Sequence, residues 1–224
     1  MAENGMKDRI LEASLLHVPF DGWSEATFRA AITDTGVASA LARALFPRGG
    51  VDLALAYHAR GDAEMVAKLA VTDLAALRFR DRIVKAVRTR LEVADKELVR
   101  RGTTLFALPQ HALDGAKAVW GSADAIWTAV GDTSTDINWY TKRATLTAVY
   151  GSTVLYWLGD DSSGNTATWE FLDRRIEGVM RFEKLKASVA GNPLGKALIN
   201  GPLRIFDKIR APRQADDMPG REAI

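Results

Sequence analysis

The chain has 224 residues, of which 47% are hydrophobic and 26% are charged, and this composition is typical of a soluble globular protein. Its 30 Lys and Arg against 28 Asp and Glu leave a net charge of only +2, which by itself gives no indication of a nucleic-acid partner. The absence of cysteine excludes disulfides, thiolate metal sites and a cysteine nucleophile.

Apolar residues recur at intervals of three and four along most of the chain, and no stretch alternates apolar and polar residues for long enough to form a convincing strand. The sequence therefore predicts an all-α bundle of about nine helices. The expected helices cover approximately residues 7–17, 24–35, 38–46, 51–69, 80–100, 111–130, 136–158, 166–190 and 194–209. The clearest boundaries are Ser24, a good N-cap, and Gly36, where a C-terminal glycine belongs.

The helix expected over residues 80–100 carries a basic face opposite its apolar one. That face consists of Arg78, Arg80, Arg82, Lys85, Arg88 and Arg90. It is either a solvated surface or an anion-binding stripe, and we favour the solvated surface.

The region before residue 50 has the layout of a helix-turn-helix. Thr35-Gly36-Val37 introduces a short helix that Phe46 closes, and a long helix follows. This layout resembles the DNA-binding half of TetR-type repressors. However, Leu41 and Leu45 occupy positions where such proteins carry polar or basic side chains toward the groove. Only Arg43 is placed to contact a phosphate, so we expect that the fold is retained and that DNA binding is lost.

Motifs of catalysis and metal binding are missing from the sequence. None of His17, His58 and His111 follows a carboxylate by three residues, so the Glu-x-x-His ligand pair of di-iron bundles is absent. There is also no His-Glu-x-x-His, phosphate-binding loop, Gly-x-Gly-x-x-Gly or Gly-x-Ser-x-Gly. The sequence therefore predicts no catalytic residue, no metal and no cofactor, and an enzyme is the weakest interpretation.

Residues 131–143, Gly-Asp-Thr-Ser-Thr-Asp-Ile-Asn-Trp-Tyr-Thr-Lys-Arg, form what we call the signature segment: a polar turn that leads into a helix. Asp136, Trp139, Tyr140 and Arg143 stand at i, i+3, i+4 and i+7, so they share one helix face. Aromatic residues framed by charge are typical of a binding hot spot, but a partly buried anchor has the same pattern. Both interpretations stay open on these residues alone.

A basic amphipathic helix is predicted within residues 191–212. Its apolar half includes Leu194, Leu198, Ile205, Phe206 and Ile209, and its polar half includes Lys196, Arg204 and Lys208. This pattern is typical of a helix in a membrane interface, which we favour over a last helix docked on the domain. Liposome binding should then weaken when Ile205, Phe206 and Ile209 are made polar. Residues 213–224 are polar and are expected to be a disordered tail.

The signature segment, taken with Ile10-Leu-Glu-Ala13, Gly22-Trp23, Trp127 and the terminal amphipathic helix, resembles the ubiquinone-biosynthesis accessory proteins with a TetR-like fold. The resemblance extends over nearly the whole chain. It implies a non-enzymatic protein that holds ubiquinone intermediates or other isoprenoid lipids and reaches the membrane through its terminal helix. It also implies pairing with the di-iron hydroxylase that oxidises demethoxyubiquinone. The alternative is a TetR-type transcriptional repressor that binds DNA and a small apolar ligand.

The resemblance also implies where a partner would bind. Matching positions carry over Asp124, Ile126, Trp127, Trp139 and Tyr140 to the partner surface, and the shared helix face adds Asp136 and Arg143. A polyisoprenoid tail needs a long apolar cavity, which a helical bundle can open between helices. The candidate lining residues are Leu69, Leu105, Phe106, Trp120, Val149, Leu155, Phe171 and Met180, although for any single one of them we favour plain core. The ligand would be an isoprenoid quinone or a phospholipid.

The expected organisation has four parts: a degenerate helix-turn-helix over residues 1–50, a helical lipid-binding domain over 51–190, the membrane helix over 191–212 and the tail over 213–224. TetR-like domains pair through their last two long helices, so we expect a homodimer by analogy. Residues 1–8 have neither a signal-peptide core nor a transit-peptide composition. We therefore expect a cytoplasmic protein, peripheral at a bacterial inner membrane, or on the matrix side of the mitochondrial membrane if eukaryotic.

Overall fold

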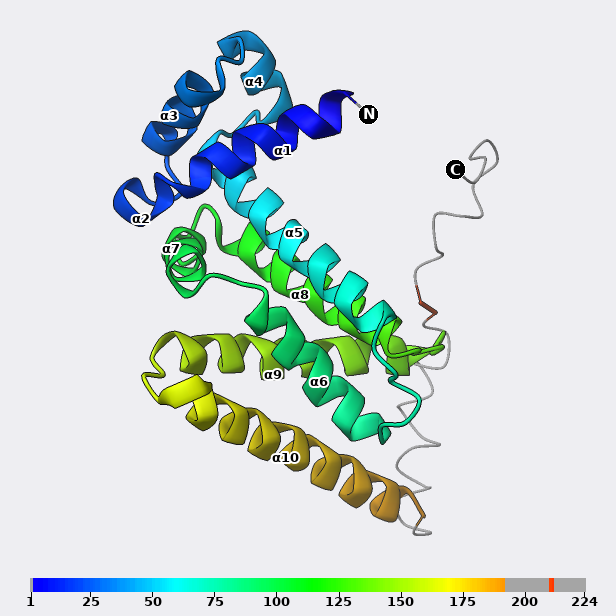
Figure 1. The fold of residues 1–224 in the computed structure, drawn as a ribbon. Helices are drawn as coiled ribbons and strands as arrows, with labels where there is room; N and C mark the ends of the chain where they lie inside the picture. The colour runs from blue at the N-terminus through cyan, green and yellow to red at the C-terminus, as the bar shows by residue number, and fades with distance from the viewer. Residues whose placement is uncertain (1, 192–209, 212–224) are drawn as a thin grey trace.

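A computed structural model describes residues 2–191 and 210–211, and this part of the chain folds into ten α-helices and one short 3-10 helix without a strand (Figure 1). The helices are α1 Ala2–Leu15, α2 Val18–Asp21, α3 Glu25–Thr35, α4 Ser39–Leu45, α5 Gly50–Ala70, α6 Phe79–Glu92, α7 Lys96–Phe106, α8 Ala112–Ala129, α9 Ile137–Leu158, η1 Ser163–Asn165 and α10 Thr166–Gly191. The predicted all-α class is confirmed.

Local capping explains where helix α3 begins and ends. The Ser24 side chain accepts a hydrogen bond from the backbone N–H of Thr27, which satisfies a free donor of the first turn. Gly36 adopts the left-handed conformation with φ of 65°, and its N–H bonds to the carbonyl of Thr33. Both boundaries agree with the sequence-based expectation.

The expected single helix over residues 80–100 is instead two helices, α6 and α7. Asp95 starts the second one, because its side chain accepts hydrogen bonds from the backbone N–H groups of Glu97 and Leu98. Helix α7 then continues through Gly102, where a break was expected. Between the first two expected helices, the four residues of α2 form one helical turn.

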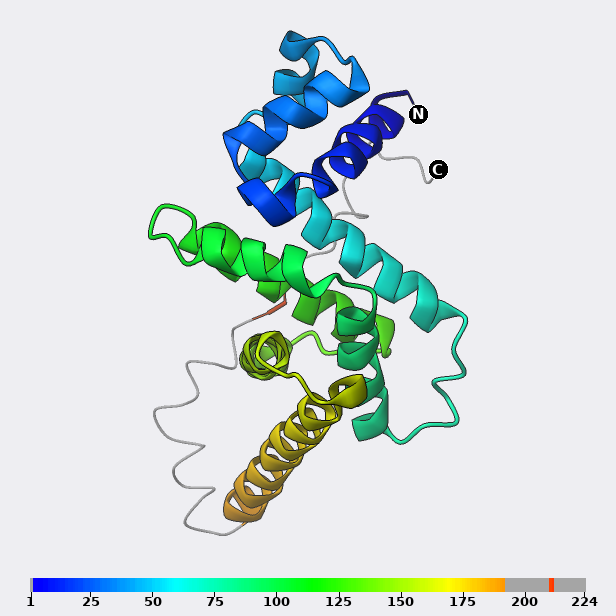
Figure 2. The same ribbon diagram turned by 60° about the vertical axis from the view of Figure 1, so that its left-hand side comes forward.

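Two hydrophobic clusters hold the helices together. The first is built from α1 to α4 and the start of α5, with Ile10, Phe28 and Leu53 at most 1% exposed. The second lies among α5, α6, α8, α9 and α10, where Ile126 and Leu172 are fully buried. Figures 1 and 2 place α1–α4 at one end of the molecule and α10 at the other, with α5 and α8 side by side between them.

Polar contacts also join the N-terminal helices to the rest of the molecule. The Trp23 indole N–H donates to the Leu98 carbonyl at 3.0 Å, and the Trp23 ring packs 5.4 Å from that of Tyr57. Arg48 forms an ion pair with Asp114 of α8 at 2.8 Å. These contacts attach the helix-turn-helix-like unit directly to the helices that follow it.

Residues 192–209, which contain the predicted membrane helix, and residues 212–224, which contain the expected tail, lie outside the described residues. This applies to the apolar positions of that helix, Leu194, Leu198, Ile205, Phe206 and Ile209, and to its basic positions Lys196, Arg204 and Lys208. Within the part of the chain that the structure describes, no helix is both long enough and apolar enough to span a bilayer.

Candidate functional site

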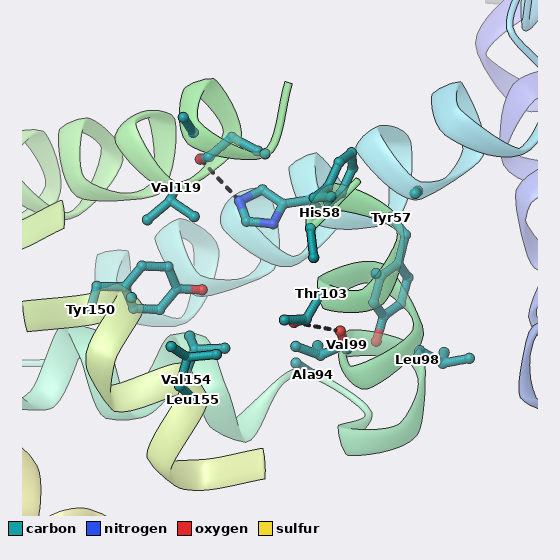
Figure 3. A pocket seen from close by; sticks show the side chains of 18 of the residues that line it. Tyr57, His58, Ala94, Leu98, Val99, Thr103, Val119, Tyr150, Val154 and Leu155 are labelled. Carbon is teal, nitrogen blue, oxygen red and sulfur yellow. Dashed lines mark hydrogen bonds between the residues drawn. The ribbon is translucent and has the colours of Figure 1, made fainter. Parts of the chain in front are cut away.

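A mostly apolar pocket of about 450 Å³ opens between α5, α7, α8 and α9 (Figure 3). Its volume lies within the roughly 300–1,000 Å³ typical of small-molecule sites. The apolar lining includes Trp23, Leu91, Leu98, Val119, Val154 and Leu155. Trp23 belongs to the helix-turn-helix-like N-terminal unit, which consists of α1–α4 and the turns that follow them. That unit therefore supplies part of the pocket wall.

One wall of the pocket carries a connected polar network. The His58 Nε2 atom lies 3.1 Å from the Ala118 carbonyl oxygen and 2.8 Å from the Ser122 hydroxyl. That hydroxyl donates to Asp62 at 2.7 Å, and Asp62 also accepts from the Nε atom of Arg90 at 2.6 Å. Arg90 is 3% exposed, so its guanidinium and the Asp62 carboxylate form a buried ion pair.

The protonation states around the pocket follow from burial. Burial lowers the pKa of His58 below its ordinary value, which outweighs the raising effect of the Asp62 carboxylate. Burial likewise raises the pKa of Tyr150 and of Tyr57 above the ordinary tyrosine value. Near neutral pH the two phenols and the imidazole are therefore uncharged, and the one ion pair in the wall has no net charge.

The structure brings together only some of the residues predicted to line a lipid cavity. Phe106 and Leu155 line this pocket. Val149 and Met180 instead line a smaller cavity of about 250 Å³ between α6, α9 and α10. The others lie elsewhere: Leu69 is in the core, Leu105 packs against the N-terminal cluster, Phe171 stacks on Tyr156 at 4.4 Å, and Trp120 lies 6.2 Å from Trp139.

Sequence reasoning missed three of the pocket residues, Trp23, His58 and Tyr150. Trp23 reaches the pocket from the N-terminal unit. His58 contacts Ser122, which lies about 60 residues away in the sequence, and Tyr150 is buried in the bundle. Tyr150 and His58 do stand out as polar groups within apolar stretches, and that pattern is the available signal.

A second candidate site is an aromatic face formed by Trp120, Trp139 and Tyr140, all partly exposed. The Trp139 ring lies 4.8 Å from that of Tyr140 in an edge-on arrangement and 6.2 Å from that of Trp120. The described residues Arg210 and Ala211 lie beside it, since the Tyr140 hydroxyl donates to the Arg210 carbonyl at 3.3 Å. The aromatic face thus joins α8, α9 and a C-terminal segment.

Arg143 supports the aromatic face from beneath. Its guanidinium lies 4.0 Å from the centre of the Trp139 ring. It is 3% exposed and pairs with Asp124 and with Asp132, whose Oδ2 atom is 3.0 Å away. Burial acts to raise the pKa of Asp132, but hydrogen bonds from Lys142, Ser134 and Arg143 outweigh it and lower this pKa to about 2.

Three residues expected on a partner surface are buried, and that expectation needs correction. Ile126 is 0%, Trp127 9% and Arg143 3% exposed. They face the neighbouring helices: Trp127 packs 5.7 Å from Phe79 and donates its indole N–H to the Lys142 carbonyl.

Asp136 also departs from the expected helix face. It is the N-cap of α9, and its side chain accepts from the Asn138 backbone N–H at 3.0 Å. Of the predicted set, Asp124, Trp139 and Tyr140 keep partly exposed side chains on α8 and α9 without serving as caps.

Two basic residues of the helix-turn-helix-like unit have partners within the chain. Arg43 pairs with Glu25 and lies 4.4 Å from the centre of the Phe28 ring, while Arg48 pairs with Asp52 and Asp114. Leu41 is 44% exposed, so helix α4 presents an apolar side chain to the outside. On α6, Arg90 is buried rather than solvated. Nowhere in residues 2–191 and 210–211 do three or more His, Asp or Glu gather as metal ligands.

Comparison with solved structures defines the class of protein. A crystal structure of a TetR transcriptional regulator from Nitrosomonas europaea covers 77% of this chain and 97% of its own with a TM-score of 0.63 and 18% identity. At that identity the likeness shows the fold alone, so the chain is a helical protein of TetR-like architecture.

Sequence comparison identifies the family within that class. The COQ9 family model matches residues 112–183. The ubiquinone biosynthesis proteins COQ9 of Drosophila melanogaster and Rattus norvegicus are each 32% identical, over 84% and 89% of this chain. COQ9-B of Xenopus laevis is 30% identical over 89% of this chain and 70% of its own length. The chain belongs to the COQ9 family. It spans 59% of the fly protein and 66% of the rat protein.

Proposed function

We propose that this chain is a lipid-binding accessory protein of ubiquinone biosynthesis with no catalytic step of its own. It takes an isoprenoid quinone intermediate into the pocket between α5, α7, α8 and α9 and presents it at a membrane to the demethoxyubiquinone hydroxylase. The observation that carries the proposal is the apolar pocket itself, in a chain whose relatives are named ubiquinone biosynthesis proteins.

The physics of presentation favours such a pocket. A quinone with an isoprenoid tail is stable in the bilayer because leaving it exposes apolar surface at about 25 cal/mol per Å². An apolar cavity in a protein held at the membrane surface offsets that loss and lowers the barrier to delivery. The C-terminal amphipathic helix would supply the membrane contact, and a homodimer formed through the last long helices belongs to the same proposal.

The aromatic face is the proposed docking surface for the hydroxylase. Trp139 and Tyr140 are partly exposed and pack edge to face, and the Trp139 ring rests on the buried Arg143. Rigid aromatic side chains that rest on well-packed residues are typical of interface hot spots. Trp120 joins them from α8, so it belongs to this proposal rather than to the lipid cavity.

Filling the pocket should remove lipid uptake without unfolding the protein. Gly151 lines the pocket on α9, and a Cβ added there would approach only a Val119 methyl group, at 3.9 Å. Gly151→Trp should therefore place its ring in the cavity, and the free energy of unfolding should change by no more than about 1 kcal/mol, because glycine is a poor helix former. Mass spectrometry of extracted lipid and quinone titration measure the result.

The matched control is Gly121→Trp on the exposed surface of α8, where an added Cβ meets nothing within 4 Å. It should leave lipid content unchanged. Equal lipid content in wild type and Gly151→Trp, with both folded, would show that the ligand does not occupy this pocket. A delipidated wild type that takes up no quinone or isoprenoid would overturn the proposed function.

Removing the aromatic face should weaken the hydroxylase complex selectively. Trp139→Ala should cost about 2 kcal/mol of binding free energy, roughly a thirtyfold rise in Kd, and Tyr140→Ala somewhat less. Lipid content should stay the same in both variants. Phe20→Ala is the control, because Phe20 is 83% exposed on the N-terminal unit. If both variants lose their fold instead, the two aromatic residues are structural anchors.

A further inference from the structure

The polar network at the pocket wall has hydrogen-bonding groups that an apolar tail does not use. Figure 3 shows the His58 imidazole from α5 and the Tyr150 phenol from α9 bordering the same space. Tyr150 is 3% exposed, and the Ser122 hydroxyl acts on its phenol, opposing the rise in pKa that burial causes. A phenol hydroxyl has one donor and two acceptor positions, so this contact leaves it capacity for a ligand.

The imidazole of His58 presents an acceptor. Its Nε2 atom lies 3.1 Å from the Ala118 carbonyl oxygen, which can only accept, so Nε2 carries the hydrogen. In the neutral ring the Nδ1 atom is then a lone-pair acceptor. The side chain is 22% exposed, although most of its surroundings are apolar.

Thr147 provides an independent indication that a polar group belongs here. It lines the pocket one turn before Tyr150 on α9, and its Oγ1 atom is buried. Among the residues that the structure describes, this hydroxyl finds no hydrogen-bond partner. Leaving a buried hydroxyl unpaired is unfavourable, so a ligand oxygen or hydroxyl that reached it would recover part of that loss.

The charge of the wall decides which head group fits. Of the described residues that line the pocket, Arg90 alone carries a permanent charge, and Asp62 neutralises it at 2.6 Å. The Arg90 guanidinium also donates to the His58 carbonyl at 3.0 Å, so its Nε and one terminal nitrogen are engaged by partners within the protein. A phosphate placed here would lose its water without gaining a free cation.

We propose that Tyr150, His58 and Thr147 form a head-group subsite that selects a neutral, oxygen-bearing head over an anionic one and over a plain hydrocarbon. This inference rests on the proposed function, because it assumes that the pocket holds a lipid. It narrows the choice between quinone and phospholipid: a benzoquinone or phenol offers carbonyl or hydroxyl oxygens to Tyr150 and His58, whereas a phosphate offers a charge that the wall does not match.

The test compares three probes that share one tail: a benzoquinone with a three-isoprene tail, the tail as a hydrocarbon, and the tail as its monophosphate. Full-length protein is titrated with each, and Trp fluorescence reports binding because Trp23 lines the pocket. Wild type should bind the quinone most tightly. Tyr150→Phe should weaken quinone binding about three- to tenfold, the loss of one hydrogen bond, and leave hydrocarbon binding unchanged.

Two further variants keep the result decisive. Thr147→Val removes the unpaired hydroxyl with almost no change in shape, so it should weaken the quinone alone even if Tyr150→Phe folds poorly. Tyr156→Phe is the matched control, because Tyr156 is 39% exposed and stacks on Phe171. It should change none of the three affinities.

Each outcome separates the subsite from the proposed function. If Tyr150→Phe and Thr147→Val weaken quinone and hydrocarbon equally, or if wild type binds the monophosphate as tightly as the quinone, the subsite is overturned while lipid binding stands. If wild type binds none of the three probes, both the subsite and the proposed function are overturned.

Discussion

Replacing Arg143 by alanine is expected to lower the free energy of unfolding by about 3 kcal/mol, the scale for removing one partner of a buried ion pair. The Asp132 and Arg143 side chains are each 3% exposed, and their closest atoms lie 3.0 Å apart. Without the guanidinium, the buried Asp132 carboxylate keeps only Lys142 and Ser134 as partners. Trp139 also loses the cation beneath its ring.

Denaturant unfolding of wild type and variant measures this difference. Arg174→Ala is the control, because Arg174 reaches Glu170 at 3.9 Å and both side chains are more than 60% exposed. Such surface pairs contribute less than about 1 kcal/mol. Equal unfolding free energies for wild type and Arg143→Ala would show that the ion pair contributes nothing net and that the aromatic face needs no such support.

The same cluster gives wild-type stability a defined pH dependence. The pKa of Asp132 is about 2 in the folded state, below the ordinary aspartate value of roughly 4. Its stabilising contribution, about 2 kcal/mol, is therefore complete above pH 4–5 and is lost as the pH falls through 2. The slope should be smaller in Arg143→Ala, because one of the groups that lowers this pKa is gone.

Arg143 also shows what the sequence can and cannot predict. Its spacing from Trp139 and Tyr140 correctly placed the three on related positions of one helix. Periodicity does not say how far a face extends into the bundle, and the packing of α8 and α9 against each other and their neighbours buries Arg143, Ile126 and Trp127. The segment is therefore both an anchor and an exposed face: a buried ion pair beneath partly exposed aromatic rings.

The pocket was less accessible to prediction than the fold. Helix class and several boundaries follow from local signals such as Ser24 and Gly36. Pocket residues depend on where helices cross, and His58 and Ser122, 64 positions apart, meet only after α5 and α8 have packed. The eight apolar candidates have only their apolarity in common, and core and lining residues share that property. Of these eight, only Phe106 and Leu155 line the pocket.

The role of the N-terminal unit follows from the same long-range packing. Its basic residues Arg43 and Arg48 are engaged within the chain, whereas Trp23 forms part of the pocket wall. The helix-turn-helix-like unit thus contributes to the pocket wall as well as to the fold. The junction between Trp23 and the start of α5 must therefore pack closely.

Gly50→Ala is expected to destabilise the protein by about 3 kcal/mol, the upper range for overpacking a tight site. A Cβ added at Gly50 would lie 2.6 Å from the Ser24 backbone nitrogen and 2.7 Å from the Trp23 carbonyl carbon. Both are backbone atoms, so no side-chain rotation relieves the clash. Either α5 or the segment that carries Trp23 must move.

That movement connects stability with lipid uptake. Since Trp23 lines the pocket and its indole N–H is bonded to the Leu98 carbonyl, a shift of this segment should also weaken quinone binding. Gly178→Ala is the control, because an added Cβ meets nothing within 4 Å on the exposed side of α10, and it should stabilise by up to about 1 kcal/mol. Thermal unfolding and quinone titration on both variants measure the two effects.

A Gly50→Ala protein that is as stable as wild type but takes up less quinone would show that Trp23 contributes to ligand binding and not to stability. A destabilised variant with normal uptake would show that the N-terminal unit supports the fold without shaping the pocket.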